Sequence, residues 1–189
     1  MTILVIVESP NKTKKIGHYL GPGYEVRASY GHIRDLPSSG MNVSEDGKYK
    51  PNLQLTDSGK RVIAGLRHDA KNAESVLLAT DPDREGEAIA WDLSEVLGLK
   101  NPKRIKFNEI TEAKIQEAIK SPEPINMDLV RAQQARRTLD RLIGYTASPT
   151  ISTMMNLSKL SAGRVQSPAT RIICDRERAI INFKSISHY

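Results

Sequence analysis

The sequence predicts an α/β protein in which a parallel sheet flanked by helices is followed by a mostly helical region. Two apolar stretches without alternation, residues 3–7 and 75–79, are typical of strands that are buried on both faces of a parallel sheet. Helical patterns follow both stretches, and this alternation indicates βαβ units with right-handed crossovers. After residue 122 the strand signals end and helical patterns remain.

The first strand, predicted at Ile3–Val7, leads directly into a helix. Ser9 can serve as the N-cap, and Pro10 suits the first helical position because a missing N–H costs nothing there. A polar loop rich in turn-forming residues occupies positions 38–52. The other predicted elements are strands at 24–29, 75–79 and 104–107 and helices at 56–69, 88–97 and 112–120.

The segment SPEPIN, residues 121–126, holds two prolines and is the expected seam between a domain at 1–122 and a domain at 123–189. Charge divides the chain in nearly the same place. The net charge is +6, and residues 129–189 carry ten lysines and arginines against three acids, which gives +7. A basic second domain favours a polyanionic partner, with nucleic acid as the leading candidate.

Two helices are expected in the second domain. Asp128 can cap a long helix that runs through Tyr145 and carries arginines on one face. Ser167, followed by Pro168, can cap another. Residues 146–163 are expected to link the two helices.

Composition indicates a soluble, cytoplasmic protein. A chain of 189 residues with 39% hydrophobic content can bury a core. Its first aliphatic run is far shorter than the roughly 20 apolar residues that a membrane span needs, so no membrane association is expected. The single Cys174 excludes an internal disulfide, which suits a reducing compartment. We expect the chain to be a monomer.

Four carboxylates, Asp81, Asp83, Glu85 and Glu87, crowd into seven positions after the second buried strand. The functional edge of a parallel α/β sheet lies at the carboxyl ends of its strands, so Glu8 should emerge at the same edge. Glu85 and Glu87 fit a structural role at the positive end of a helix dipole. Asp81 and Asp83 precede the helix and would repel each other without a cation such as Mg²⁺. Crowding should also raise the pKa of Glu8, which could then donate a proton.

The stretches LVIVESPNKTKKI, SYGHIRDLP and LATDPDREGEAIAW resemble the Toprim domain of bacterial type IA DNA topoisomerases. FNEIT, AQQARRTLDRLIGYTASP and LSAGRVQSPATRIICDRE resemble that family's downstream motifs in order and spacing. The resemblance covers nearly the whole chain. It implies a Rossmann-like parallel sheet followed by the first part of a helical DNA-groove domain. The implied activity is the relaxation of negatively supercoiled DNA by Mg²⁺-dependent single-strand cleavage, strand passage and religation.

The resemblance also implies roles for individual residues. Glu8 would be the catalytic carboxyl, and Lys12 would place a positive charge beside the scissile phosphate. Glu8, Asp81, Asp83 and Glu85 would hold Mg²⁺. Single-stranded DNA would be bound mainly through its backbone by His32, Arg136, Arg137, Asp140, Arg141, Tyr145, Ser161, Ala162, Gly163, Arg164, Val165 and Gln166.

In the resembled family the nucleophile is a tyrosine followed two residues later by arginine, and none of the six tyrosines here has that context. We therefore expect an amino-terminal part of a longer enzyme that does not relax DNA by itself. Two alternatives stay open. The chain could act alone as a Toprim nuclease or primase-like enzyme, which needs no tyrosine. It could also be a DNA-binding module whose acids only complement helix dipoles.

Overall fold

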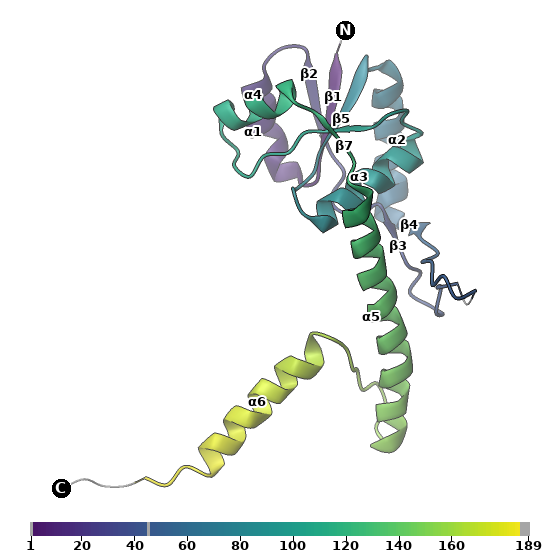
Figure 1. Ribbon diagram of the computed structural model, residues 1–189, viewed down its shortest axis with the longest axis vertical. Helices are drawn as coiled ribbons and strands as arrows, with labels where there is room; N and C mark the ends of the chain where they lie inside the picture. The colour runs from purple at the N-terminus through teal and green to yellow at the C-terminus, as the bar shows by residue number, and fades with distance from the viewer. Residues whose placement is uncertain (1, 45, 186–189) are drawn as a thin grey trace, which may run out of the picture. The chain divides into compact units, whose positions relative to one another are not determined.

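A five-stranded sheet with the strand order β2-β1-β5-β6-β7 lies at the centre of the first part of the chain (Figure 1). The computed structural model describes residues 2–44 and 46–185. Four strands run parallel: β1 (Ile3–Val7), β2 (Tyr24–Ala28), β5 (Ser75–Ala79) and β6 (Lys103–Arg104). The short β7 (Glu123–Pro124) pairs antiparallel with β6.

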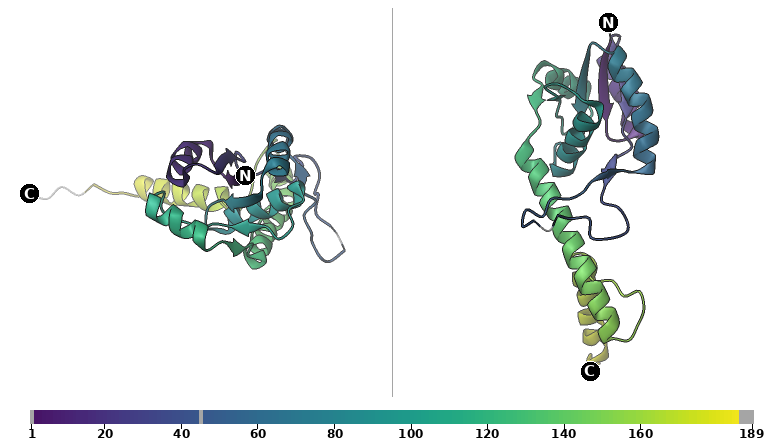
Figure 2. Two further views of the ribbon diagram at one scale, coloured as in Figure 1. Left: turned by 90° about the horizontal axis from the view of Figure 1, so that it is seen from above. Right: turned by 90° about the vertical axis from the view of Figure 1, so that its right-hand side faces the viewer.

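Helices cover both faces of this sheet, which gives three layers (Figures 1 and 2). Helices α1 (Pro10–Leu20) and α4 (Glu112–Lys120) pack on one face. Helices α2 (Asp57–Asn72) and α3 (Arg84–Leu97) pack on the other. The predicted α/β class with a parallel sheet flanked by helices is confirmed.

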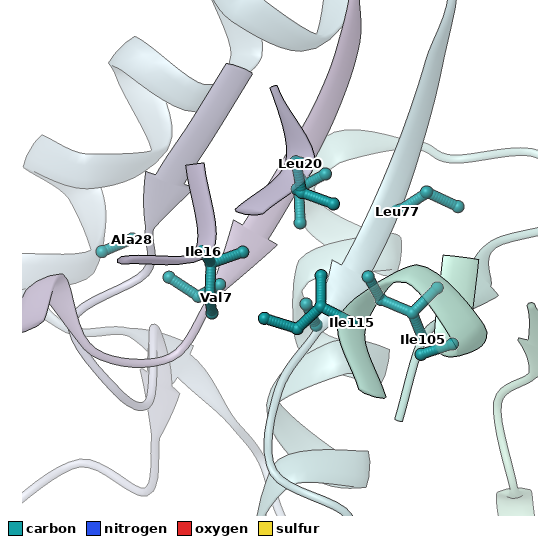
Figure 3. Packing of buried hydrophobic residues seen from close by; sticks show 10 residues of the cluster. Val7, Ile16, Leu20, Ala28, Leu77, Ile105 and Ile115 are labelled. Atoms are coloured by element: carbon teal, nitrogen blue, oxygen red, sulfur yellow. The ribbon is translucent and has the colours of Figure 1, made fainter. Parts of the chain in front are cut away.

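Successive side chains of β1 enter two separate hydrophobic cores, because neighbouring residues of a strand point to opposite faces. Val7 packs with Ile16 of α1 and Ile115 of α4 (Figure 3). Ile6 packs on the opposite face in the cluster that contains Ile89 of α3. The unbroken apolar pattern of β1 thus reflects burial on both faces, as the sequence predicted.

Side-chain caps fix where helices α1 and α3 begin. Ser9 Oγ accepts a hydrogen bond from the Asn11 N–H (3.4 Å), as expected of the predicted N-cap of α1. Helix α3 begins at Arg84, earlier than the predicted start at residue 88. The reason is that Asp83 Oδ1 accepts from the Gly86 N–H (2.8 Å) and caps the helix there.

Two other features of the first part differ from the prediction. A small antiparallel pair, β3 (Arg34–Asp35) and β4 (Gln54–Leu55), joins the two ends of the polar loop. Strand β6 ends at Arg104 instead of Phe107. Its partner β7 is only two residues long, so the ladder on that side ends with Arg104.

The chain divides into two compact units, residues 1–135 and 136–189. Helix α5 (Met127–Met154) begins in the first unit and continues in the second, which also contains α6 (Gln166–Ile181). The division falls within α5 and not at the prolines of the expected seam. A domain boundary after residue 122 therefore stays a prediction.

Helix α5 runs beyond its predicted end at Tyr145 and continues through Pro149. Threonine hydroxyls bond to main-chain carbonyl groups on both sides of this proline. Thr146 Oγ1 donates to the Leu142 carbonyl oxygen (2.7 Å), and Thr150 Oγ1 donates to the Thr146 carbonyl oxygen (2.8 Å). The first half of the expected linker is therefore helical.

The predicted caps of the last two helices are wrong. Asn126 Oδ1 accepts from the Asp128 N–H (3.0 Å), so Asn126 and not Asp128 caps α5. Helix α6 begins at Gln166, which places Ser167 inside its first turn. There the Ser167 hydroxyl accepts from the Gly163 N–H (3.2 Å) and connects the helix to the preceding segment.

Candidate active site

Glu8 and Thr80 leave two neighbouring parallel strands at the same edge of the sheet, because Val7 of β1 pairs with Ala79 of β5. From β1 the chain crosses through α1 to β2 on one side. From β5 it crosses through α3 to β6 on the other side. Ligands of open α/β sheets bind at such a reversal of strand order. The structure thus places Glu8 and Asp81 at the edge where the sequence predicts them.

The electrostatic surroundings of Glu8 show which side chains meet at this edge. Burial raises the pKa of the Glu8 carboxyl, and the negative charges of Asp81 and Asp83 raise it further. The positive charges of Lys12 and His32 act in the opposite direction, but the net pKa shift is upward. Glu8 therefore keeps its proton to a higher pH than an exposed glutamate does.

Protein groups already contact two of the predicted metal ligands. Lys12 Nζ, from α1, forms an ion pair with Asp81 Oδ1. His32 Nε2 lies 3.2 Å from Glu85 Oε2, and the Gln133 amide donates to the same oxygen (3.0 Å). Gln133 was not among the site residues predicted from the sequence, although it lies in the motif AQQARR that carries the family resemblance. Its role could not be predicted from the sequence, because no local pattern shows that the first turns of α5 lie at this edge of the sheet.

Within the described residues, no group of three or more His, Cys, Asp or Glu side chains is arranged to hold a metal ion. Asp83 Oδ1 is engaged as the cap of α3, and Asp81 and Glu85 are engaged by Lys12 and His32. The predicted set of four carboxylates is therefore not preassembled. The chemistry of the donors still fits Mg²⁺, which takes one or two carboxylates and completes its shell with water and phosphate oxygens.

The main chain that presents Asp81 is fixed by contacts with β6 and α3. Arg104 Nη2 donates to the carbonyl oxygens of Thr80 (2.7 Å) and Asp81 (3.0 Å) and is 2.7 Å from Thr80 Oγ1. The Thr80 hydroxyl donates to the Gly86 carbonyl oxygen (2.6 Å). A Cβ at Gly86 would lie 2.0 Å from the Asp81 carbonyl oxygen, so this approach requires glycine.

Glu87 is a fully buried member of an ion-pair network, which differs from the simple helix-dipole role expected of it. Its Oε1 lies 2.5 Å from Arg104 Nη1 and 3.0 Å from Lys106 Nζ. Its Oε2 accepts from the Asn126 N–H (3.1 Å), just before α5. A buried carboxylate needs such partners. The sequence held one signal of them, since Arg104 and Lys106 alternate with the apolar Ile105 and Phe107, and in the predicted strand at 104–107 they would share a face.

In the second unit, residues 160–167 contact α5 through polar groups. The Ala162 N–H donates to Ser148 Oγ (3.0 Å). Arg164 donates through Nε and Nη2 to the two carboxylate oxygens of Asp140, at 2.8 Å each. The hydrogen bond from Arg164 lowers the pKa of Asp140. Asp140, predicted to line a DNA groove, thus also orients an arginine of the same predicted set.

Other predicted DNA-binding residues of the second unit contact one another. Gln166 Nε2 donates to Ser161 Oγ (2.9 Å), next to Gly163. Arg141 Nη1 donates to the Tyr145 hydroxyl (2.6 Å), and its guanidinium lies 4.6 Å from the centre of the Tyr145 ring. Each unit therefore gathers its own part of the predicted site residues: the Glu8 edge in the first unit, and positions 136–166 in the second.

Comparison with known proteins matches both parts of the chain. The Toprim domain family matches residues 3–110, and the DNA topoisomerase family matches residues 124–189. DNA topoisomerase I (plasmid) of Xylella fastidiosa (strain 9a5c) is 49% identical over 186 residues. The solved structure of full-length topoisomerase I from Thermotoga maritima is 46% identical, with a TM-score of 0.83.

These relatives are much longer than this chain. The Xylella match covers 98% of this chain and 28% of the relative, and the Thermotoga match covers 96% of this chain and 31% of the solved chain. In the described part of the sequence, no helix combines the length and the apolar character that crossing a membrane requires.

Proposed function

This chain belongs to the Toprim family and is homologous to the amino-terminal region of bacterial DNA topoisomerase I, and from this premise we propose that it is part of a type IA DNA topoisomerase. The enzyme relaxes negatively supercoiled DNA by cutting one strand, passing DNA through the break and resealing it. The tyrosine nucleophile is supplied by a part of the enzyme outside this chain. We also propose that the enzyme is cytoplasmic, because its substrate is bacterial DNA, and that it is a monomer.

The observation that carries this proposal is the meeting of Glu8, Lys12 and Asp81 at the edge between β1 and β5. One carboxyl with a raised pKa stands beside an ammonium group and a second carboxylate. Phosphoryl transfer needs a proton donor for the leaving oxygen and positive charge around the phosphate. Glu8 and Lys12 provide these two functions from the start of one βα unit.

Each residue of the edge has a proposed role. Glu8 delivers its proton to the DNA oxygen that leaves when the strand is cut, and takes a proton back on religation. Lys12 turns from Asp81 toward the scissile phosphate. Glu8, Asp81, Asp83 and Glu85 would hold Mg²⁺, which supplies positive charge to the phosphate when bound.

The second unit binds the single-stranded segment through its backbone. Arginine presents a planar fork that suits phosphate oxygens. The second unit holds seven arginines: Arg136, Arg137, Arg141, Arg164, Arg171, Arg176 and Arg178. The predicted DNA-binding residues of the second unit are Arg136, Arg137, Asp140, Arg141, Tyr145 and positions 161–166, and His32 is the predicted DNA contact of the first unit. We propose that affinity comes mainly from phosphate contacts and falls with salt.

The match to the topoisomerase family over residues 124–189 favours this function over a stand-alone Toprim nuclease or primase-like enzyme. Neither of those activities accounts for the motifs of the second unit. The two proposals also differ in what the purified chain does to a plasmid.

A supercoiled plasmid and a single-stranded oligonucleotide provide the test. In Mg²⁺ we expect the chain to bind the oligonucleotide, to leave the plasmid supercoiled and to cut neither DNA. Relaxation of the plasmid would show that the nucleophile lies within this chain. Nicking that disappears in Asp81→Asn would instead establish a stand-alone nuclease.

A further inference from the structure

Tyr30 is an exposed aromatic residue close in the fold to Glu8. The residue follows β2 and precedes Gly31 and His32 in the sequence SYGH. It is 64% exposed. Its φ of +59° lies in the left-handed region, which residues with a Cβ seldom adopt.

Hydrogen bonds on both sides hold the Tyr30 backbone against the end of β1. The Ser29 N–H donates to the Val7 carbonyl oxygen (2.9 Å), and the Gly31 N–H donates to the Glu8 carbonyl oxygen (3.0 Å). Ser29 Oγ also donates to the Gly31 carbonyl oxygen (3.1 Å). Tyr30 is therefore attached, through its two neighbours, to the main chain of the catalytic glutamate. Unfavourable backbone geometry that the surroundings enforce is typical of functional positions.

The ring of Tyr30 differs from that of Tyr145, the aromatic residue of the predicted groove. The Arg141 guanidinium lies over the Tyr145 ring and binds its hydroxyl group. Among the described residues, the Tyr30 side chain makes no ring contact, cation contact or hydrogen bond. Because the backbone is already fixed, only the two side-chain torsions of Tyr30 are restricted when a flat ligand stacks on the ring.

We propose that Tyr30 is a stacking platform for an unpaired base of the DNA strand whose phosphate is bound at the Glu8 edge. This inference rests on the proposed function, because the phosphate at Glu8 and Lys12 brings the neighbouring base to Tyr30. Aromatic rings bind successive bases of single strands by stacking, with little dependence on sequence. Bases in a duplex are already stacked and paired, so the ligand is single-stranded.

The chain contains a matched control for this proposal. Tyr49 has the same side chain, a φ of +47° and 55% exposure, but it lies in the polar loop at 38–52. Replacement of Tyr30 or Tyr49 by alanine removes the same ring from the same backbone conformation. If the two variants differ in their affinity for DNA, the cause is the position of the lost ring and not the loss of a tyrosine as such.

The experiment measures the affinity for short single-stranded oligonucleotides at one salt concentration, with 2-aminopurine placed in turn at each position. We expect Tyr30→Ala to weaken binding by about 5- to 150-fold, which is the range that one stacked base supports. Tyr30→Phe keeps the ring and should stay within about twofold of the wild type, as should Tyr49→Ala. One 2-aminopurine position should be quenched on binding in the wild type and in Tyr30→Phe, but not in Tyr30→Ala.

An oligonucleotide with an abasic site at the quenched position completes the comparison. The wild type and Tyr30→Ala should bind it equally, because the base that distinguishes them is missing. A Tyr30→Ala variant with wild-type affinity and quenching would overturn the stacking proposal and leave the proposed function intact. A wild-type chain that binds no single-stranded DNA would overturn the proposed function itself, and the role of Tyr30 with it.

Discussion

The carboxyl of Glu8 lies between two negative and two positive groups. Burial raises its pKa, Asp81 and Asp83 raise it further, and Lys12 and His32 only partly offset this. An acid whose pKa is raised in the folded state binds its proton more tightly there than in the unfolded state. Its contribution to stability is therefore present below the unfolded pKa and is lost as the pH rises through the folded pKa.

This linkage predicts the effect of Glu8→Gln on stability. The variant should unfold at a higher temperature than the wild type at pH 7, because it removes a carboxylate that folding disfavours. The gain should be less than about 1 kcal/mol, since solvent screens this partly exposed group. At pH 4 the difference should shrink, because the wild-type carboxyl is then largely protonated. Thermal unfolding at both pH values measures it.

Glu74→Gln is the control, because Glu74 is exposed and directly precedes β5, at the opposite end of that strand from the edge. Its unfolding temperature should follow the wild type at both pH values. A Glu8→Gln variant that is less stable than the wild type at pH 7, but equally stable at pH 4, would show that folding lowers the pKa of Glu8. That result would contradict the raised pKa.

Single residues differ in how far the sequence could identify them. Glu8 and Asp81 were predictable, because each follows a strand whose burial is visible in its apolar pattern. Gln133 and the buried pair of Glu87 with Arg104 were not, because these contacts join segments far apart in the chain. The topology that brings such segments together is a property of the packed sheet and not of a local pattern.

At the scale of elements, Glu87 connects three parts of the fold. It lies in α3, pairs with Arg104 of β6 and binds the main chain of Asn126, which caps α5. Arg104 in turn binds the carbonyl oxygens of Thr80 and Asp81. The position of Asp81 thus depends on the same buried pair that anchors the start of α5.

Variants of this pair test that dependence. Arg104→Met leaves the Glu87 carboxylate buried without its guanidinium and should cost about 3–5 kcal/mol of unfolding free energy. Addition of Glu87→Leu should recover a large part of that loss, because no uncompensated charge remains. Urea denaturation of both single variants and the double variant gives the coupling energy.

The exposed pair of Lys60 with Asp57 serves as the comparison, at 63% and 93% side-chain exposure. Its coupling should be much smaller than that of the buried pair, because solvent screens both charges. If the losses at Arg104 and Glu87 simply add, the two side chains do not depend on each other, which would contradict an ion-pair network that joins them.

Elements with strong local patterns were predicted well and weakly marked ones were not. The ranges of β1 and β5 follow from their unbroken apolar stretches and that of α4 from its helical pattern, and the structure confirms all three. The two-residue strand β7 is stabilised only by its pairing with β6, which no local pattern reveals. The extension of α5 beyond Tyr145 passes through Pro149, and a local sequence pattern reads a proline as the end of a helix.

At the scale of the whole molecule, charge is divided unevenly along the chain. Residues 129–189 carry +7 of a total net charge of +6, so the preceding residues are close to neutral at −1. The acids proposed for the catalytic edge and the arginines proposed to bind DNA thus lie in different stretches of the sequence. The compact units divide close to this change, within α5.

Salt dependence of DNA binding tests the use of this charge. The logarithm of the binding constant for a single strand should fall linearly with the logarithm of salt concentration, by about 0.7 for each phosphate contact. Arg136→Ala should make the slope shallower by about 0.7. Lys60→Ala, on α2, should leave the slope unchanged. Equal slopes for the wild type and Arg136→Ala would show that Arg136 does not contact a DNA phosphate.

The most direct test of the account is a calorimetric titration of Mg²⁺ into the chain with a single-stranded oligonucleotide bound. We expect binding heat in the wild type and in Asp57→Asn, and its loss in Asp81→Asn and Asp83→Asn. Asparagine also caps helices well, so Asp83→Asn should leave α3 in place. Equal heat in the wild type and Asp81→Asn, or no heat in any of them, would contradict a metal-binding edge beside Glu8.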